Sequence, residues 1–358
     1  MTGCCPQELM KKWHEVGVGE VGKRQATQVD IARKAGVSTA TVSRVLNRSP
    51  LVKPQVREHV LAVMAELKYY PHAAARALAS SRTYTIGAVI PTLNNSIFAA
   101  SVNSFEARLQ LANYTLLVAV SNYDLTVEEV QLKRLIERGV EGLLLIGNAH
   151  TDGAYRTLED SGVVYANIWA YDRKLRHPNI GFSNRKAASA IVDHLVGLGH
   201  RRIGMLAGIT AGNDRARDRM IAVREQLAKY KLQLVGEATM EVEYAIPAGR
   251  RALAKVLENG KLPTALICGN DVIAIGVLFE AQRRGIRVPQ QLSITGFDNM
   301  PLIQDISPRM TTVNVPAQEM GERAATAILS AIEEGNSIRS REIKASLIIG
   351  ETTATPRH

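Results

Sequence analysis

The segment from Ser38 to Leu46 carries the side chains best suited to recognising another molecule in the first part of this sequence. It is predicted to be the second of two short helices, because Gly36 interrupts a helical pattern that begins near Thr27 and Ser38 is a favourable N-cap residue. Two short helices joined by a tight turn form a helix-turn-helix. The second helix of this motif enters the major groove of DNA, and its first residues reach base edges.

Four residues of this second helix are predicted to face bases: Thr39, Ala40, Ser43 and Arg44. Arg44 can donate two parallel hydrogen bonds to guanine, and Ala40 and the methyl group of Thr39 can contact thymine methyl groups. The alternative for Arg44 is a phosphate contact or a surface position. Another set of residues is predicted to cap helices or to contact phosphates, which orients the motif without selecting sequence: Thr27, Ser38, Thr41, Ser43, Asn47 and His72.

Positive charge is concentrated around this motif. The whole chain has a formal net charge of +10, and the stretch from Lys23 to Arg82 contains eleven Lys and Arg residues but only three Asp and Glu residues, a net of +8. Phosphate binding needs clustered cations, so this distribution is typical of a nucleic-acid-binding module. Charge alone is equally compatible with a solvated basic face that has no partner.

The segments on either side of the two helices have different predicted roles. Residues 1–24 lack periodicity and contain four glycines, which predicts a disordered tail or a start codon placed too early. A third helix is predicted to start after Pro54, at Gln55, and to end before residues 70–71. Residues 72–81 are rich in alanine and too short to form a stable helix alone, so they are predicted to be a hinge that orders when something packs against it.

From Tyr84 onward, short aliphatic runs alternate with amphipathic helical segments. This alternation predicts parallel sheets with right-handed crossovers. The region exceeds the size of one doubly wound sheet, so we expect two such sheets that face each other across a cleft, with a ligand at the carboxyl ends of the strands. The predicted strands are 86–90, 115–120, 142–146, 163–168, 180–181, 203–207, 234–239, 265–268 and 292–297.

Several protein classes are excluded by what the sequence lacks. It contains no apolar run of the roughly 18 residues that a membrane span needs, and its opening lacks the apolar block of a secretory signal, which predicts a cytoplasmic protein without membrane contact. Cys4, Cys5 and Cys268 are too few for a disulfide framework or a zinc site, and no metal or cofactor is expected. The glycine pair at 197 and 199 follows a helix and precedes a strand, the reverse of a dinucleotide-binding fingerprint, so catalysis is not expected.

The segment TQVDIARKAGVSTATVSRVL at residues 27–46 resembles the DNA-reading module of the LacI/GalR family of bacterial transcriptional regulators. The resemblance continues through Asn47, the helix around Val56, the junction LKYYP at 67–71 and the Ala-x-x-Leu-Ala pattern at 75–79. Later stretches are similar to the regulatory domain of this family, which is built like a periplasmic sugar-binding protein: IGAVIP (86–91), NNSIFA (94–99), HLVGLGHRRIGMLAG (194–208), NDRARDR (213–219), CGND (268–271) and SITGFDN (293–299).

The resemblance assigns a role to the hinge. It implies that two copies of Leu78, one from each chain of a dimer, wedge into the minor groove at a central CpG step and kink the DNA. Ala75 and Ala79 would be small enough to let the two hinge helices approach. The alternative for Leu78 is that it plugs the start of the large domain. His72 stands where the family more often has asparagine, and it can still donate to a phosphate.

The resemblance also implies an effector site in the cleft. Arg219 stands where the family uses an arginine that forks onto sugar hydroxyls or a carboxylate. Asp298 matches the family's hydroxyl-accepting aspartate, and Asn270 and Asp271 follow another strand where the family places ligand contacts. Phe98 and Trp169 would offer flat apolar surfaces to a sugar ring. The alternative for both is ordinary packing in the core. Trp169 stands where many relatives carry an aspartate. Weaker candidates are Asn95, Asn184 and Arg217.

Together these inferences predict an α/β, periplasmic-binding-protein-like regulatory domain of two lobes, each a doubly wound parallel sheet, behind an all-α helix-turn-helix domain. The predicted boundaries are a tail at 1–24, a DNA-binding domain at 25–71, a hinge at 72–83, and a ligand-binding and dimerisation domain at 84–358, with an N-lobe at about 84–183 and 314–342 and a C-lobe at about 184–313 and 343–354.

The expected function is that of a transcriptional regulator whose affinity for a pseudo-palindromic DNA operator is controlled by a small molecule. A repressor is preferred to an activator, and a carbohydrate or sugar acid is preferred to a nucleobase as the effector. A homodimer is expected, because the chain ends at ETTATPRH without the leucine heptads of tetrameric relatives, and because a dimer supplies the two-fold symmetry of the operator. The alternatives are a free solute-binding protein, which the basic N-terminal module opposes, and an α/β enzyme.

Overall fold

A computed structural model of the chain describes residues 26–46, 49–69, 82–94, 96–258, 260 and 262–356. It divides into a small unit, Met1–Arg82, and a large unit, Thr83–His358. No helix within the described ranges is long and apolar enough to cross a lipid bilayer.

Within the described residues of the small unit lie three helices, α2 (Gln28–Ala35), α3 (Thr39–Leu46) and α4 (Pro54–Glu66). Helix α2 ends at Gly36, whose φ of 63° is accessible to glycine without steric cost. Helix α4 begins at Pro54, one residue before the predicted start, because proline is well suited to the first position of a helix. Side chains from all three helices form one apolar core, which includes Ile31, Val42 and Val60. The predicted all-α helix-turn-helix unit is confirmed.

The first lobe of the large unit is built on a parallel six-stranded sheet with the order β11-β5-β4-β3-β1-β2. Its strands are β1 (Thr85–Ile90), β2 (Thr115–Val120), β3 (Gly142–Ile146), β4 (Val164–Ile168), β5 (Asn179–Gly181) and β11 (Arg341–Glu342). Its helices are η1 (Ser96–Phe98), α6 (Ala99–Leu111), α7 (Leu125–Glu137), α8 (Asp152–Ser161) and α13 (Ala317–Glu334). Alternate residues of β1 point to opposite faces: Ile86 and Ala88 pack in the cluster that contains α6 and α13 residues, and Val89 packs in the cluster of α7 and α8.

The second lobe is built on a parallel four-stranded sheet with the order β7-β6-β8-β9. Its strands are β6 (Ile203–Gly208), β7 (Thr239–Val242), β8 (Ala265–Cys268) and β9 (Ser293–Thr295). Its helices are α9 (Asn184–Gly197), α10 (Asp214–Lys229), η2 (Gly236–Ala238), α11 (Ile246–Glu258), α12 (Asp271–Arg283) and η3 (Pro301–Gln304). The side chains of α9 and α10 pack on one face of this sheet, and those of α11 and α12 pack on the other.

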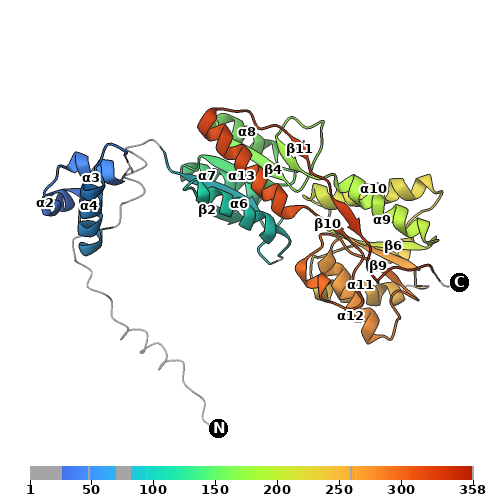
Figure 1. The fold of residues 1–358 in the computed structure, drawn as a ribbon. Helices are drawn as coiled ribbons and strands as arrows, with labels where there is room; N and C mark the ends of the chain where they lie inside the picture. Colours follow the sequence, from blue (N-terminus) through green and yellow to red (C-terminus); the bar gives the residue numbers. More distant parts are fainter. Residues whose placement is uncertain are drawn as a thin grey trace, which may run out of the picture. The chain divides into compact units, whose positions relative to one another are not determined.

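The chain crosses between the two lobes three times. The crossings lie between β5 and α9, between β10 (Thr312–Asn314) and α13, and between β11 and β12 (Ser346–Ile348). Strands β10 and β12 pair antiparallel, with Val313 opposite Leu347, and Figure 1 shows the red C-terminal segment returning from the first lobe to the second. The predicted fold class, two doubly wound parallel sheets, is confirmed.

Two details of the predicted strands are wrong. The apolar run 234–239 is not the strand, because the chain turns through η2 after Val235, and the strand that pairs with β6 is Thr239–Val242. Leu234 and Val235 instead pack against the core from a loop, so their burial reflects packing and not strand pairing. The short strands β10, β11 and β12 were not predicted, since elements of two or three residues are too short to show periodicity.

Candidate functional site

Helix α3 separates a buried face from an exposed face. Val42 and Val45 are buried in the core of the small unit, whereas Thr39, Ala40 and Arg44 are exposed. Ala40 and Arg44 are four residues apart, so they lie one above the other on the same side of the helix. Ser43 is half-buried beside them. The four residues predicted to read bases therefore occupy positions on α3 that its core does not cover.

The hydroxyl groups predicted as caps or phosphate contacts form local hydrogen bonds in the small unit. Thr27 caps α2, since its Oγ1 accepts from Asp30 N–H at 3.3 Å while Asp30 Oδ2 accepts from the Thr27 N–H at 2.9 Å. Ser38 Oγ accepts from the N–H of Thr41 at 3.1 Å and lies 2.9 Å from Thr41 Oγ1. Each motif satisfies backbone donors that a helix start leaves free.

Several predicted site residues lie outside the described residues: Asn47, His72, Ala75, Leu78, Ala79 and Asn95.

A narrow cavity of about 10 Å³ lies between the two lobes of the large unit. Ten residues line it: Ile97, Phe98, Tyr123, Trp169, Asn213, Arg215, Arg219, Tyr244, Asn270 and Asp298. Every one of them follows the carboxyl end of a parallel strand, either in the loop or in the first turns of the next helix. This is the position at which open α/β sheets bind ligands, and we refer to this cavity as the cleft.

Arg219 is held in the wall of the cleft by three neighbours. Its Nη1 donates to Asn184 Oδ1 at 2.8 Å, its Nη2 lies 3.4 Å from the hydroxyl of Tyr244, and its guanidinium carbon lies 4.5 Å from the ring centroid of Phe297. Asn184 also donates to the carbonyl of Trp169 at 3.0 Å. Asn184 therefore positions two cleft residues without lining the cleft.

Two donors in the cleft wall have no acceptor. Within the described part of the chain, Arg219 Nε and Asn270 Nδ2 are buried and form no hydrogen bond. Asn270 uses its Oδ1 to cap α12, where it accepts from Ile273 N–H at 3.0 Å. Because an unpaired buried donor costs free energy, these two groups are available to donate to a molecule in the cleft that carries oxygen acceptors.

Asp298 is the acidic member of the cleft. Burial raises the pKa of its carboxyl group to about 7, although the nearby guanidinium groups of Arg219 and Arg215 act in the opposite direction. Its backbone φ of 108° is unusual for a residue other than glycine, and backbone pairing with the β10 segment fixes it, since Asp298 N–H donates to Val313 O at 3.0 Å. Its carboxyl group can donate or accept near neutral pH.

Asp271 is placed differently from the other predicted cleft residues. It is fully buried and is not among the residues that line the cleft. Its Oδ1 accepts from Thr312 Oγ1 at 2.7 Å, and its Oδ2 accepts from Met300 N–H at 2.8 Å. Asp271 thus ties the start of α12 to strand β10 and to the loop that carries Asp298.

Phe98 and Trp169 belong both to the apolar core and to the cleft wall. Only 2% of Phe98 and 3% of Trp169 is exposed, and their rings meet edge to face with centroids 5.0 Å apart. Trp169 Nε1 donates to Ser101 Oγ at 3.0 Å, which fixes the plane of the indole ring. Packing in the core and contact with a ligand, the two roles predicted for Phe98 and Trp169, are therefore compatible.

Two hydrogen bonds connect the lobes beside the cleft. Arg215 Nη1 donates to the carbonyl of Ile146 at 3.1 Å, and Asp214 Oδ2 accepts from the N–H of Asn148 at 2.8 Å. Arg215 and Asp214 are themselves paired at 3.0 Å. The space they occupy exists because residue 147 is glycine: a Cβ atom there would overlap Arg215 Nη1 and come within 2.5 Å of Asp214 Oδ1.

Five residues of the cleft were not predicted from the sequence: Ile97, Tyr123, Asn213, Arg215 and Tyr244. Two signals could have found some of them. Tyr123 and Tyr244 follow strand ends, just as Asn270 and Asp298 do, and their rings lie 5.8 Å apart across the cleft. Arg215 is four residues before Arg219 and so shares its helix face, whereas Arg217, the weaker candidate, is exposed on another side.

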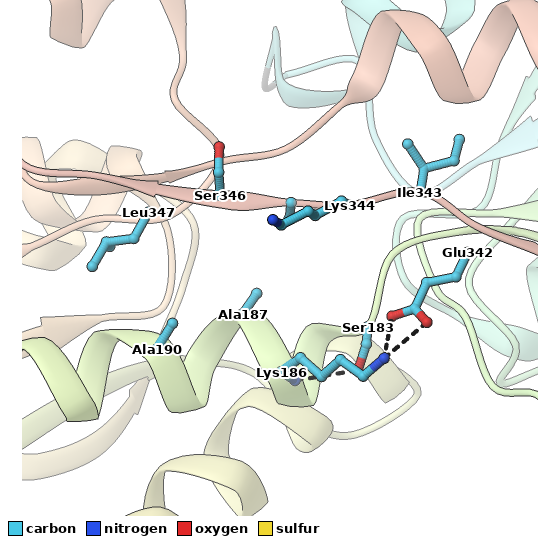
Figure 2. Close-up of a pocket in the computed structure, with 10 residues that line it drawn as sticks. Ser183, Lys186, Ala187, Ala190, Glu342, Ile343, Lys344, Ser346 and Leu347 are labelled. Atoms are coloured by element: carbon cyan, nitrogen blue, oxygen red, sulfur yellow. Dashed lines mark hydrogen bonds and ion pairs between the residues drawn. The ribbon is translucent and has the colours of Figure 1, made fainter.

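A second cavity, of about 420 Å³, lies between α9 and the crossing segment 342–347. Figure 2 shows Lys186 on α9 reaching Glu342, whose two carboxylate oxygens each lie 2.8 Å from its Nζ. None of the predicted site residues lines this cavity.

Comparisons with protein families match both units of the chain. The model of the bacterial regulatory proteins of the lacI family matches residues 27–72, and the model of the periplasmic binding protein-like domain matches residues 192–353.

Individual relatives are similar over most of the chain. The ribose operon repressor of Haemophilus influenzae is 31% identical over 91% of this chain and 98% of its own length. The transcriptional repressor PurR of Klebsiella pneumoniae is 30% identical over 87% of this chain and 93% of its own length.

Solved structures of the same architecture align over nearly the full chain. A LacI-family transcriptional regulator from Silicibacter pomeroyi has a TM-score of 0.84 at 28% identity, with 91% of this chain and 99% of that chain covered. The lac repressor dimer bound to its operator and an anti-inducer has a TM-score of 0.82 at 26% identity, with 92% and 100% covered.

Proposed function

Because the chain belongs to the lacI family of bacterial regulatory proteins, it is a DNA-binding transcriptional regulator and not an enzyme, and we propose that it is a repressor whose effector binds in the cleft. The unpaired Arg219 Nε and Asn270 Nδ2 in the cleft wall are the observation that carries the effector site. A free solute-binding protein would not need the helix-turn-helix unit that the family model matches at residues 27–72.

The effector that suits the cleft is a carbohydrate or a sugar acid. Arg219 and Asn270 offer donors to hydroxyl or carboxylate oxygens, Asp298 offers an acceptor for hydroxyl groups, and Phe98 and Trp169 offer apolar surfaces for the faces of a sugar ring. The ribose operon repressor of Haemophilus influenzae, a relative named for a sugar, is consistent with this chemistry.

DNA recognition is assigned to the exposed face of α3. Thr39, Ala40, Ser43 and Arg44 would face base edges, and the hinge residues Ala75, Leu78 and Ala79 would enter the minor groove, as the resemblance implies. The regulator binds as a homodimer to a pseudo-palindromic operator, as the lac repressor dimer does. We place the protein in the cytoplasm, where its DNA target lies.

Regulation follows from coupling between the cleft and the dimer. A ligand that contacts both lobes stabilises one lobe orientation, and a change in orientation alters the spacing of the two DNA-binding units in the dimer. Binding of the effector therefore changes the affinity of the protein for the operator, and binding of the operator changes its affinity for the effector.

A thermal-shift screen of neutral sugars and sugar acids tests the effector assignment. A compound that binds the cleft raises the melting temperature by mass action, and Arg219→Lys should need an about tenfold higher concentration of the compound for the same rise. A second arm measures retention on random-duplex DNA as salt increases, where steep elution is expected of a DNA-binding regulator. If no compound raises the melting temperature of the parent, the effector part fails; if retention does not depend on salt, the DNA-binding part fails.

A further inference from the structure

Helices α11 and α12 form a groove on the second lobe that is separate from the cleft. The two backbones are in close contact where Gly249 meets Gly276, since a Cβ atom on either glycine would overlap a carbonyl oxygen of the other helix. This contact brings the outer side chains of both helices together around a cavity of about 340 Å³. We call it the arginine groove, because its polar lining consists of Arg250, Arg251, Arg283, Arg284 and Glu280.

Glu280 forms the floor of the arginine groove and orients three of the arginines. Its side chain is only 4% exposed, and it accepts from Arg284 Nε at 2.6 Å, from Arg283 Nε at 2.9 Å and, at the longer distance of 3.5 Å, from Arg250 Nε. The hydrogen bonds from Arg283 and Arg284 lower the pKa of Glu280 to about 2, so it is ionised at neutral pH.

The arginines retain donors that Glu280 does not use. Arg250 and Arg284 contact Glu280 through Nε, and in the described part of the chain their Nη groups form no hydrogen bond. The side chains of Arg250 and Arg283 are 46% and 57% exposed, so a molecule in the groove can reach them. Among the described residues, Arg251 pairs with the exposed Glu243 at 4.0 Å. A buried carboxylate thus holds guanidinium groups with free donors directed away from it.

The charge of the arginine groove is strongly positive. Four guanidinium groups surround one carboxylate, a net charge of +3. Planar guanidinium groups bind phosphate through paired hydrogen bonds, and two phosphate groups carry a charge of about −3 to −4 near neutral pH.

We propose that the arginine groove is a second ligand site, for a small anion that carries at least two phosphate groups. The cavity volume lies within the range of roughly 300–1,000 Å³ typical of small-molecule sites. Three of the four cations meet at Glu280, whereas a DNA backbone is contacted by an extended basic stripe. Helix α12 joins the two sites, because its N-cap Asn270 lines the cleft and its last residue Arg283 lines the groove, about 20 Å further along the helix.

Calorimetric titration of the full chain with inorganic pyrophosphate, at constant ionic strength, tests the proposal. The parent should show one saturable site per chain. The double variant Arg250→Gln, Arg284→Gln should bind at least about tenfold more weakly, because it loses two charge-assisted contacts. The matched control is Arg176→Gln, Arg323→Gln, which removes two arginines of the first lobe that each pair with one glutamate. It should bind within about twofold of the parent.

Each other outcome overturns the proposal. Absence of saturable binding to the parent would show that the arginines form only a surface ion-pair network. Equal binding to parent and groove variant would place the anion elsewhere, such as in the basic DNA-binding unit. Weaker retention of the groove variant on random duplex at fixed salt would make the groove a DNA contact. If the double variant does not fold, the single variant Arg251→Gln replaces it, because the side chain of Arg251 is 71% exposed. This variant should still weaken pyrophosphate binding, and unchanged binding would contradict the proposal.

Discussion

The Nη1 atom of Arg215 lies 3.1 Å from the carbonyl oxygen of Ile146, so a side chain of the second lobe is hydrogen bonded to a strand end of the first. The neighbouring Asp214 reinforces this contact by accepting from the N–H of Asn148. These bonds are formed by the protein itself. They therefore bias the lobe orientation that an effector must stabilise or oppose.

Replacing Gly147 by alanine should break the hydrogen bond between Arg215 and Ile146, because the added Cβ atom would overlap Arg215. Residue 147 also has a φ of 86°, which alanine adopts at a cost of about 1 kcal/mol. We expect amide hydrogen exchange at Asn148 to accelerate by about fivefold or more, since each lost hydrogen bond is worth about 1 kcal/mol. The control is Gly335→Ala, which has a φ of 73° and open space around it. Unchanged exchange at Asn148 in Gly147→Ala would contradict the interlobe role.

Asp298 should make the stability of the protein depend on pH. Its folded-state pKa of about 7 is above the ordinary value of 3.8, so between about pH 4 and pH 7 the folded state retains a proton that the unfolded state has lost. The free energy of unfolding therefore falls as pH rises through this window. The Asp298→Asn variant should lose this pH dependence of the free energy of unfolding. The control variant Asp305→Asn, which changes an exposed residue, should retain it. Parallel pH profiles for the parent and Asp298→Asn in denaturant unfolding would refute the assignment.

Arg219→Lys should weaken the binding of any cleft effector by about tenfold or more, because a single ammonium group cannot reproduce the paired donors of a guanidinium group. Arg217→Lys is the matched control, since it lies two residues away on an exposed side of α10. The measurement is the concentration of effector needed for half of the maximal thermal shift. Equal weakening by both variants would indicate a general effect of charge and not a contact in the cleft.

Arg44→Ala should remove discrimination between operators while leaving effector stabilisation intact. Loss of a bidentate contact to guanine costs about 1–3 kcal/mol, which is roughly a ten- to hundredfold fall in the ratio of specific to random-duplex affinity. Arg33→Ala is the control, because Arg33 is 76% exposed on α2 and pairs only with Asp30 at 3.6 Å. If Arg44→Ala selects genomic fragments as the parent does, α3 is not the reading helix.

Local features of the sequence determined the elements. Thr27, Gly36 and Ser38 set the ends of the first two helices because capping and positive φ depend on neighbouring residues alone. The parallel sheets followed from the alternation of aliphatic runs and amphipathic helices, and the position of the cleft followed from the rule that ligands bind at the carboxyl ends of strands. Spacing also placed Arg44 opposite the buried Val42 and Val45.

Only the tertiary structure decided which polar groups at those strand ends face the cleft. Asn270 and Asp271 are adjacent in sequence, yet Asn270 lines the cleft and Asp271 turns to Thr312, more than forty residues later in the chain. Arg215 reaches Ile146 only because the lobes approach and Gly147 leaves room. The arginine groove likewise depends on the close contact of two helices at Gly249 and Gly276. Such contacts join residues that are distant in sequence, so local periodicity carries no information about them.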